Sequence, residues 1–310
     1  MPNVGQERSV QRARYARHVP AWNAEVVVDE PLARRLLAQF PELEAETLRL
    51  IGEGWDNTAW LVDEAWVFLF PRREVVIPAL EREIALLPLL APQLPLPVPV
   101  PRFLGRPAEG YPWPFFGSAF LRGSEPGAVE LDDDARTQVA RDLAAFLQVL
   151  HTLELDADLP ADPTGRGDTR KRARLAREDL ADLGRLDERA ERVLAEGEKL
   201  PPAGAAVVAH GDLHFRHVLV DGGRAAAVID WTDLCRADPC IDLSLLWSFV
   251  PAPRRAEVVA AYGELTAQQL LRSRVLAIQL CAVLARYGRA EGAPTVEREA
   301  LSGLERTVED

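Results

Sequence analysis

Residues 207–231 read VVAHGDLHFRHVLVDGGRAAAVIDW, and this stretch concentrates the reactive side chains of the chain. Three of the five histidines, His210, His214 and His217, fall within eight residues, with Asp212 among them and Asp230 after the next apolar run. Burying charged and imidazole groups beside apolar strands costs free energy unless each group has a partner. Dense clusters of this kind are often functional. We therefore expect a site here, at the ends of short buried strands.

The spacing within this stretch is typical of phosphoryl transfer. That reaction needs a carboxylate that orients the acceptor hydroxyl and takes its proton, ligands that hold Mg²⁺ on the phosphates, and a cationic group for the nucleotide. In protein kinases the aspartate base and a metal ligand share one short loop, and a second aspartate begins the next loop. Asp212, His217 and Asp230 reproduce this layout. A hairpin over residues 218–229 would return Asp230 to the edge that carries Asp212.

Four ordered motif pieces over residues 210–243 resemble the aminoglycoside phosphotransferase superfamily, which includes macrolide, choline and fructosamine kinases. The resemblance extends over roughly residues 47–250, and its first half looks like the antibiotic-kinase branch. The pieces in the second half are His210-Gly211-Asp212-Leu213-His214, Val218-Leu219-Val220-Asp221, Ile229-Asp230-Trp231, and Asp238-Pro239 with Asp242-Leu243. Those in the first half are Ile51-Gly52-Glu53-Gly54-Trp55-Asp56-Asn57, Phe70-Pro71-Arg72-Arg73, Leu80-Glu81-Arg82-Glu83 and Tyr111-Pro112-Trp113-Pro114.

The resemblance implies roles for five residues around the histidine-rich stretch. Asp212 would be the catalytic base or the group that orients the hydroxyl. Asp230 would be the principal Mg²⁺ ligand, with His217 as a second metal ligand. His210 would brace the loop, and Asp242 would anchor it by accepting backbone N–H bonds.

The same resemblance implies a nucleotide site in the first half of the chain, for ATP or GTP as phosphoryl donor. The turn around Gly52 and Gly54 would face the phosphates, and Ser118–Leu121 would form the hinge against the nucleotide base. The residues expected to bind the nucleotide are Gly52, Gly54, Asn57, Arg72, Glu83, Ser118 and Phe120.

Two positions depart from the superfamily's usual pattern. His217 stands where asparagine is usual, and imidazole suits Zn²⁺ better than Mg²⁺, which prefers oxygen ligands. Macrolide kinases look similar in carrying histidine here, which favours a macrolide-like or other bulky hydroxylated substrate. Leu69 stands where a phosphate-gripping lysine or arginine is usual, and an alkyl side chain cannot hold a phosphate. Arg72 or Arg73 could supply that charge, with Glu83 pairing with one of them.

The apolar pattern predicts an α+β fold, and the resemblance implies a bilobal, protein-kinase-like arrangement. We expect an N-terminal extension over residues 1–24, a small strand-rich and nucleotide-binding N-lobe over 25–123, and a larger, mainly helical C-lobe over 124–310 with the catalytic loop and substrate-binding helices. The expected strands are 47–51, 58–62, 66–70, 115–121, 205–209, 218–220 and 225–229. The expected helices are 76–90, 135–153, parts of 165–199 and further segments from 239 to about 309. The proline-rich run 92–101 is expected to be an extended connector, because proline lacks the amide donor that a helix needs.

Composition limits the partners and the compartment. The net charge of −12 disfavours binding to nucleic acid, which is itself a polyanion. No apolar run reaches the roughly 20 residues of a membrane helix, and the arginine-rich first residues lack the apolar core of a signal peptide. The three cysteines are an odd number without zinc-like spacing, which favours a reduced, cytoplasmic protein. The oligomeric state cannot be read from the sequence.

Alternative functions remain open at this point. An acceptor that is a metabolic amino alcohol or sugar would fit the same motifs as an antibiotic. Leu69 also fits a kinase-like protein that binds nucleotide with little catalysis. The histidines of residues 210–217 could instead indicate a zinc hydrolase, although the tighter His-x-His and His-Glu-x-x-His motifs of those enzymes are absent.

Overall fold

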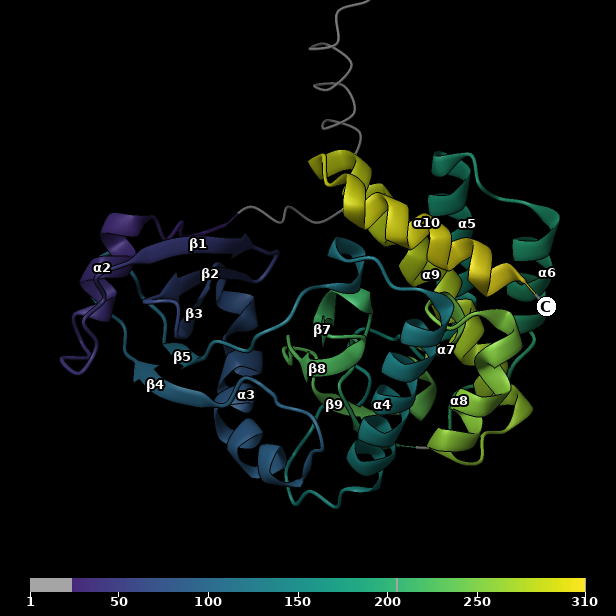
Figure 1. Cartoon of the computed structure of the whole chain (residues 1–310), viewed down its shortest axis with the longest axis horizontal. Coiled ribbons are helices and arrows are strands. Elements are labelled where there is room, and N and C mark those ends of the chain that lie inside the picture. Colours follow the sequence, from purple (N-terminus) through teal and green to yellow (C-terminus); the bar gives the residue numbers. More distant parts are fainter. Residues whose placement is uncertain (1–23, 205, 310) are drawn as a thin grey trace, which may run out of the picture. The chain divides into compact units, whose positions relative to one another are not determined.

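Figure 1 shows the computed structural model of the chain, which describes residues 24–204 and 206–309. The expected N-terminal extension lies outside the described residues, apart from Ala24. Contacts between Cα atoms divide the chain into two compact units. The first holds the described residues up to Pro88 together with Pro99–Phe120, and the second holds Leu89–Val98 and the described residues from Leu121 onward. The expected fold class is confirmed, because the first unit is a strand-rich lobe and the second a mainly helical one.

A five-stranded antiparallel sheet in the order β1-β2-β3-β5-β4 forms the first unit. Its strands are β1 (Leu48–Glu53), β2 (Asn57–Val62), β3 (Trp66–Pro71), β4 (Pro101–Gly105) and β5 (Phe115–Ala119). The turn from β2 to β3 places Asp63 and Glu64 at φ of 52° and 51°, a left-handed conformation that reverses the chain within a few residues. The register of β2 and β3 runs from Asn57 opposite Pro71 to Val62 opposite Trp66.

Aromatic side chains fill the core of this sheet. Phe68, Phe70 and Phe115 are fully buried, and the rings of Phe70 and Phe115 stack with their centroids 4.7 Å apart. Gly117 faces Phe68, and a Cβ atom at that position would lie 2.5 Å from the ring, so only glycine fits. The helix α2 (Glu30–Leu37), which was not predicted, buries its apolar face in the same aromatic core. The fold of this unit therefore rests on side-chain packing as much as on strand pairing.

The proline-rich connector differs from its prediction at both ends. α3 (Ile77–Leu90) is followed by a 3₁₀ turn over Ala91–Gln93, where the fixed φ of Pro92 suits a first-turn position. The prediction of an extended run over 92–101 is therefore wrong at its first two residues. At the other end Pro101 begins β4, an edge strand, where a proline is tolerated.

Seven helices of the described residues form most of the second unit. They are α4 (Asp133–Thr152), α5 (Thr169–Leu183), α6 (Glu188–Gly197), α7 (Leu245–Ser248), α8 (Arg255–Tyr262), α9 (Ala267–Glu291) and α10 (Pro294–Val308). α9 is the longest, and α5 and α10 lie against it (Figure 1). The side chain of Asp132 caps α4 by accepting the amide of Ala135 at 2.8 Å, and the helix begins two residues before the expected position 135. None of the helices in the described part of the chain combines the length and the apolar character that crossing a membrane would require.

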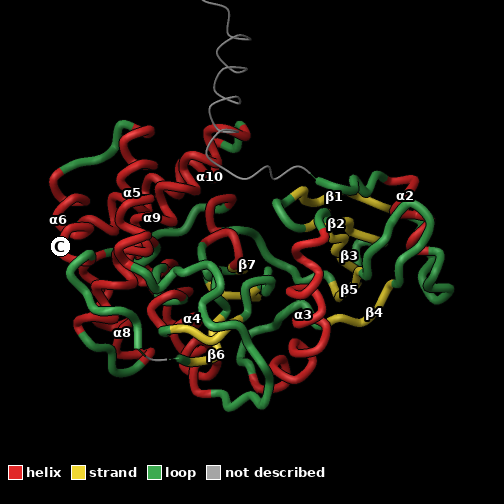
Figure 2. The backbone as a smooth tube through the Cα atoms, turned by 180° about the vertical axis from the view of Figure 1, so that it is seen from behind, coloured by secondary structure: helices red, strands yellow, loops and turns green. Residues whose placement is uncertain are grey.

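Two small strand pairs lie beside these helices and hold the histidine-rich stretch (Figure 2). β6 (Val207–Ala209) pairs with β9 (Cys235–Ala237), and β7 (Val218–Asp221) pairs with β8 (Arg224–Val228) across the expected hairpin turn. β9 was not predicted, and β6 is shorter than its expected range, of which Ala205 is not described. The loop 210–217 leaves β6 and enters β7. Its position is therefore fixed at both ends by strand pairing.

Candidate functional site

The carboxylate of Asp242 anchors the loop 210–217. The carboxylate of Asp242 accepts the amide N–H of His210 at 2.8 Å and that of Gly211 at 2.9 Å. The Nε2 atom of His151, in α4, lies 3.1 Å from the same carboxylate. Asp242 is fully buried, and burial alone would raise its pKa, but the His151 contact and the backbone donors leave the pKa below its ordinary value. An ionised carboxylate that accepts several N–H bonds is a strong anchor for the loop.

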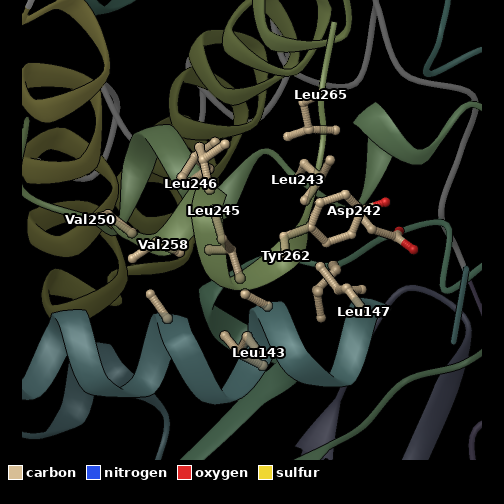
Figure 3. A pocket seen from close by; sticks show the side chains of 14 residues that line it. Leu143, Leu147, Asp242, Leu243, Leu245, Leu246, Val250, Val258, Tyr262 and Leu265 are labelled. Carbon is tan, nitrogen blue, oxygen red and sulfur yellow. The ribbon is translucent and has the colours of Figure 1, made fainter. Parts of the chain in front are cut away.

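The anchor stands at the end of an apolar pocket of the second unit. Figure 3 shows Asp242 and Tyr262 at one end of this pocket, with Leu143 and Leu147 of α4 along one wall. The Tyr262 hydroxyl lies 2.8 Å from Nδ1 of His151, whose other ring nitrogen faces Asp242. If His151 carries its proton on Nε2, Tyr262 donates to His151 and His151 donates to Asp242, so one neutral tautomer satisfies the whole chain. These hydrogen bonds link α8 and α4 to the loop 210–217.

His210 braces the loop from inside. Its Nε2 donates to the carbonyl of Ile229 at 3.0 Å, and its Nδ1 accepts the amide of Asp212 at 3.3 Å. Its ring lies 4.7 Å from that of Trp231, measured between centroids. Burial lowers the pKa of His210, so the imidazole is neutral and both of its nitrogens are used within the protein.

Gly211 has no room for a side chain. Its φ is 90°, in the left-handed region, and a Cβ atom would lie 2.1 Å from the carbonyl oxygen of Asp233. The loop 210–217 and the loop after β8 therefore touch backbone to backbone at this point. This close approach fixes the direction in which the next side chain, Asp212, leaves the loop.

Asp212 presents one carboxylate oxygen to a cation and keeps the other free of close partners. Its Oδ1 lies 2.7 Å from an Nη atom of Arg166. Its Oδ2 lies 3.8 Å from Nε2 of His214 and 4.0 Å from Nδ1 of His217, beyond hydrogen-bond distance. Burial raises the pKa of Asp212 to about 6, against the lowering effect of Arg166, while 23% of its side chain stays exposed. A partly exposed carboxylate that is held through one oxygen, with no hydrogen-bond partner on the other, can accept a proton from a ligand hydroxyl.

Arg166 and Asp233 are functional-site residues that the sequence did not single out. Arg166 lies in the loop before α5, and one of its Nη atoms donates to Asp233 at 2.7 Å while the other contacts Asp212. Arg166 and Asp233 are 67 positions apart in the sequence and belong to no motif quoted above. A single arginine among 36 basic residues carries no local signal of such a contact.

His217 and Asp230 form the second half of the site. His217 Nδ1 donates to the carbonyl of Asp212 at 2.8 Å, so Nε2 is the nitrogen that faces Oδ2 of Asp230, 3.2 Å away. Two acceptor atoms at this distance need a proton or a cation between them. Asp230 has φ of 64° and a side chain that is 49% exposed. Burial would raise its pKa, but His217, His210 and Thr232 hold the pKa below its ordinary value. An imidazole nitrogen and an ionised carboxylate at this separation match two neighbouring ligands of a divalent cation, each about 2.1 Å from the metal.

His214 does not complete a zinc site. Ligand atoms of Asp212, His214 and His217 lie within 4.8 Å of one another, which satisfies distance alone. The Nδ1 atom of His214, however, accepts the amide of Arg216 at 3.3 Å, so the neutral ring carries its proton on Nε2, the nitrogen that faces Asp212. Burial lowers the pKa of His214 well below its ordinary value. The tautomer set by this cap leaves no lone pair for a third ligand, which weighs against the zinc-hydrolase alternative.

The glycine turn of the first unit is held by Arg72. Gly52 lies in β1 and Gly54 follows it, with the Gly54 amide donating to the carbonyl of Asn57 at 2.9 Å. The Arg72 guanidinium donates to the carbonyl of Gly54 at 2.6 Å. Arg73 forms an ion pair with Asp56 in the same turn. Both arginines thus brace the turn that the resemblance assigns to the phosphates.

The remaining predicted nucleotide residues occupy β5, its end and α3. Ser118 is buried in β5, and the amide of Phe120 donates to the carbonyl of Ala65 at 2.8 Å, which leaves only its carbonyl and side chain for a ligand. Glu83 is buried in α3. Leu69 lies in β3 opposite Ala59 and Phe116.

Comparisons with known proteins identify the family of the chain and solved structures with a similar fold. A model of the phosphotransferase enzyme family matches residues 47–276. Among solved structures, the GDP and kanamycin complex of APH(2″)-IIIa superposes with a TM-score of 0.66 at 23% identity, over 90% of this chain and 98% of that one. The macrolide 2′-phosphotransferase MphH from Brachybacterium faecium gives 0.58 at 26% identity, over 89% and 98% of the two chains. Macrolide 2′-phosphotransferase type I gives 0.60 at 22% identity, over 90% and 98%.

The search of curated proteins returned no match. The family match covers well over half of the chain and includes the glycine turn, the loop 210–217 and Asp230. The chain belongs to the phosphotransferase enzyme family.

Proposed function

We propose that this phosphotransferase moves the γ-phosphoryl group of ATP or GTP to a hydroxyl group of an aminoglycoside- or macrolide-like antibiotic. The observation that carries the proposal is the pair of carboxylates on neighbouring loops of the second unit. Asp212 has one oxygen fixed by Arg166 and one that lies 3.8 Å or more from the neighbouring histidines, and Asp230 faces His217 at 3.2 Å. One group suits a hydroxyl and the other suits a cation, which are the two requirements of phosphoryl transfer.

Asp212 acts on the acceptor. Its free Oδ2 accepts a hydrogen bond from the substrate hydroxyl and orients that oxygen toward the γ-phosphorus. The new bond joins the hydroxyl oxygen to phosphorus, the bond from phosphorus to the bridging β–γ oxygen breaks, and the nucleoside diphosphate leaves. The hydroxyl proton passes to Asp212 and from there to solvent. His210 and Asp242 hold the loop so that this carboxylate keeps its direction.

His217 and Asp230 would hold Mg²⁺. When bound, the ion would neutralise charge on the phosphate oxygens and keep the nucleotide in place. His217 contributes a lone pair whose direction is set by its hydrogen bond to the Asp212 carbonyl, and Asp230 contributes an ionised carboxylate. The proposed metal site therefore combines an imidazole nitrogen, a ligand of borderline softness, with a hard carboxylate oxygen.

For the nucleotide we propose the residues of the first unit that the resemblance selects. Gly52 and Gly54 would approach the phosphates, with Asn57 and Arg72 supporting the turn. Ser118 and Phe120 would meet the base, and Glu83 would orient a cationic side chain. The nucleotide-bound complexes of similar structures, such as the GDP complex of aminoglycoside 2′-phosphotransferase-IIIa, support a purine nucleotide as donor.

A second function is favoured by one observation, the alkyl side chain of Leu69 where a phosphate-binding cation is usual. In the described residues Arg72 and Arg73 both bind the glycine turn. A chain that binds nucleotide but transfers phosphoryl groups slowly would fit this arrangement. Nucleotide titration with and without Mg²⁺, beside the turnover measurement below, separates the two functions.

The test is a nucleotide-consumption screen against aminoglycosides, macrolides and amino alcohols, with product mass as the second readout. The wild-type chain should add one phosphoryl group to at least one acceptor, and Asp212→Ala should abolish the transfer with unchanged circular dichroism. Asp221→Ala is the matched control, because Asp221 is an exposed aspartate at the end of β7. Transfer retained in Asp212→Ala would overturn the proposal, and tight nucleotide binding without transfer to any acceptor would favour the second function.

A further inference from the structure

We propose that Arg166 is a positioning residue for the reaction: it fixes the carboxylate of Asp212 so that a single oxygen faces the acceptor hydroxyl. This inference rests on the proposed function and adds to it a residue outside every motif of the sequence. Arg166 does not touch the phosphates in this scheme. It acts through Asp212.

The guanidinium of Arg166 is held in one orientation by the second unit itself. One Nη atom contacts Oδ1 of Asp212 at 2.7 Å. The other donates to Oδ2 of Asp233 at 2.7 Å and to Oγ1 of Thr164 at 2.8 Å. Only 13% of the Arg166 side chain is exposed. A planar group with both ends occupied cannot rotate without losing contacts on both sides.

The backbone that carries Arg166 is also fixed. The carboxylate of Asp162 accepts the amides of Arg166 at 2.7 Å and of Gly167 at 2.8 Å. Asp168 then caps α5 by accepting the amides of Arg170 and Lys171, both at 3.1 Å. The arginine therefore projects from a closed turn at the start of a helix, which is a rigid support for a side chain.

Asp233 contacts both Arg166 and the loop that carries Asp212. Its carboxylate binds Arg166, and its backbone carbonyl closes on Gly211, the residue directly before Asp212. The same residue thus restrains the guanidinium and the loop on which the carboxylate stands. Arg166, Asp212 and Asp233 form a closed set of contacts between three loops of the second unit.

The consequence concerns the two oxygens of Asp212. With Oδ1 held by Arg166, Oδ2 lies 3.8 Å from Nε2 of His214 and 4.0 Å from Nδ1 of His217, and neither is within hydrogen-bond distance. Oδ2 is thus left to the acceptor. Without Arg166 the carboxylate could turn toward either imidazole and lose the direction that proton transfer requires. A displacement of about 1 Å in a reacting group can cost about 10²-fold in rate.

A purely structural role is the competing explanation, because Arg166 also neutralises buried carboxylates. The two roles differ in what they change. A structural role lowers the unfolding midpoint and leaves turnover of the folded fraction intact. A positioning role lowers kcat, while the KM for the nucleotide, whose proposed contacts lie elsewhere, stays constant.

The experiment measures kcat, KM and the urea midpoint for Arg166→Gln, Arg166→Lys and Asp233→Asn. Arg166→Gln should lower kcat by about 10²-fold at constant nucleotide KM. Arg166→Lys should recover part of that loss, because an ammonium can still reach Asp212 but lacks the fork that also holds Asp233. Asp233→Asn removes the negative charge of the second anchor and leaves only an amide oxygen to accept from Arg166, so it should give an intermediate kcat.

Arg177→Gln is the matched control. Arg177 also pairs with two carboxylates, those of Glu191 at 2.8 Å and Glu198 at 2.6 Å, but it lies on α5 with no contact to the site. The Arg177→Gln variant should have a lower urea midpoint of unfolding and the wild-type kcat. Wild-type kcat in Arg166→Gln, or an equal loss of kcat in Arg177→Gln, would overturn the inference. If Arg166→Gln does not fold, Arg166→Lys and Asp233→Asn decide in the same way. A wild-type chain without transfer that depends on Asp212 would instead overturn the proposed function, and with it the role of Arg166.

Discussion

The Nε2 atom of His217 lies 3.2 Å from Oδ2 of Asp230, and the tautomer that directs this nitrogen is set by the carbonyl of Asp212. The proposed metal pair and the proposed base are therefore coupled through one imidazole ring. A change in the ring affects both the ligand that the metal meets and the backbone beside the base. Metal identity and turnover should respond together to substitutions at this position.

His217→Asn should change the metal preference of the enzyme. Imidazole favours transition metals over Mg²⁺, whereas an amide oxygen does not. We expect the ratio of Mn²⁺-supported to Mg²⁺-supported kcat to be about tenfold lower in His217→Asn than in the wild type. His214→Asn is the control, because the tautomer of His214 leaves it no lone pair for the metal. The ratio of Mn²⁺-supported to Mg²⁺-supported kcat in His214→Asn should match that of the wild type. An unchanged ratio in His217→Asn would remove His217 from the metal site.

Gly211→Ala should be strongly destabilising. The left-handed backbone alone costs an alanine about 1–2 kcal/mol, and the clash with the Asp233 carbonyl adds to that cost. Gly222→Ala in the neighbouring hairpin provides the comparison, because Gly222 has φ of 54° and a Cβ atom added there would have no neighbouring atom within 4 Å. Urea denaturation of both variants measures the difference. Equal losses of stability in the two variants would mean that the loop around Asp233 moves to accommodate the added Cβ atom without a cost in unfolding free energy.

Glu299→Gln should weaken the second unit. Glu299 binds Arg136 at 2.7 Å and Arg306 at 2.7 Å, and all three side chains are largely buried. Loss of the charge leaves two arginines facing each other with no anion, which should cost about 3 kcal/mol of unfolding free energy. Glu297→Gln, on the same helix, breaks the more exposed pair with Arg289 and should cost less than about 1 kcal/mol. The prediction fails if the two variants lose the same stability.

The link between Asp142 and Arg224 should make stability depend on pH. Burial would raise the pKa of Asp142, but hydrogen bonds from Arg224 and the Ala225 amide leave its pKa below the ordinary value. A lowered pKa in the folded state means that the contribution is present above the unfolded-state pKa of about 3.9 and is lost as pH falls through the folded-state value. Because Arg224 is 64% exposed, we expect Asp142→Asn to cost only about 1 kcal/mol at pH 7.

Denaturation at pH 7 and at pH about 3 tests this dependence. The difference between Asp142→Asn and the wild type should shrink at the lower pH. Asp221→Asn, in the exposed turn of the same hairpin, should differ little from the wild type at both. A cost for Asp142→Asn that is the same at both pH values would show that the carboxylate charge is not its source.

The sequence was most informative where residues that act together are also close together in the chain. The loop 210–217 and the hairpin after it are local, so their residues, their turn and their spacing could be read directly. Four strands of the first unit could be read in the same way, whereas β4 was not predicted. Roles for Asp212 and Asp230 stay predictions, although the geometry around them suits these roles. The helices α3 and α4 could be predicted because their apolar faces repeat at helical spacing, whereas α9 was expected only as part of an undivided helical region.

The contacts that span long distances in the sequence could not be read. Arg166 reaches Asp233 across 67 positions, and His151 reaches Asp242 across 91, so neither pair leaves a pattern in a short window. β9 has three residues and gains its strand character from pairing with β6 on one side and with Ala161 on the other. α2 has only eight residues, and its helix is stabilised by the aromatic core of the sheet.

The anchoring of the loop by Asp242 bears on how turnover responds to temperature. Two backbone amides and one imidazole fix this loop through contacts that form when the chain folds, without any ligand. Little conformational freedom is then left to be lost when reactants reach the transition state. The activation entropy of transfer should therefore be small, and an Eyring plot should show a barrier that is mainly enthalpic, with a rate that rises steadily until the second unit unfolds.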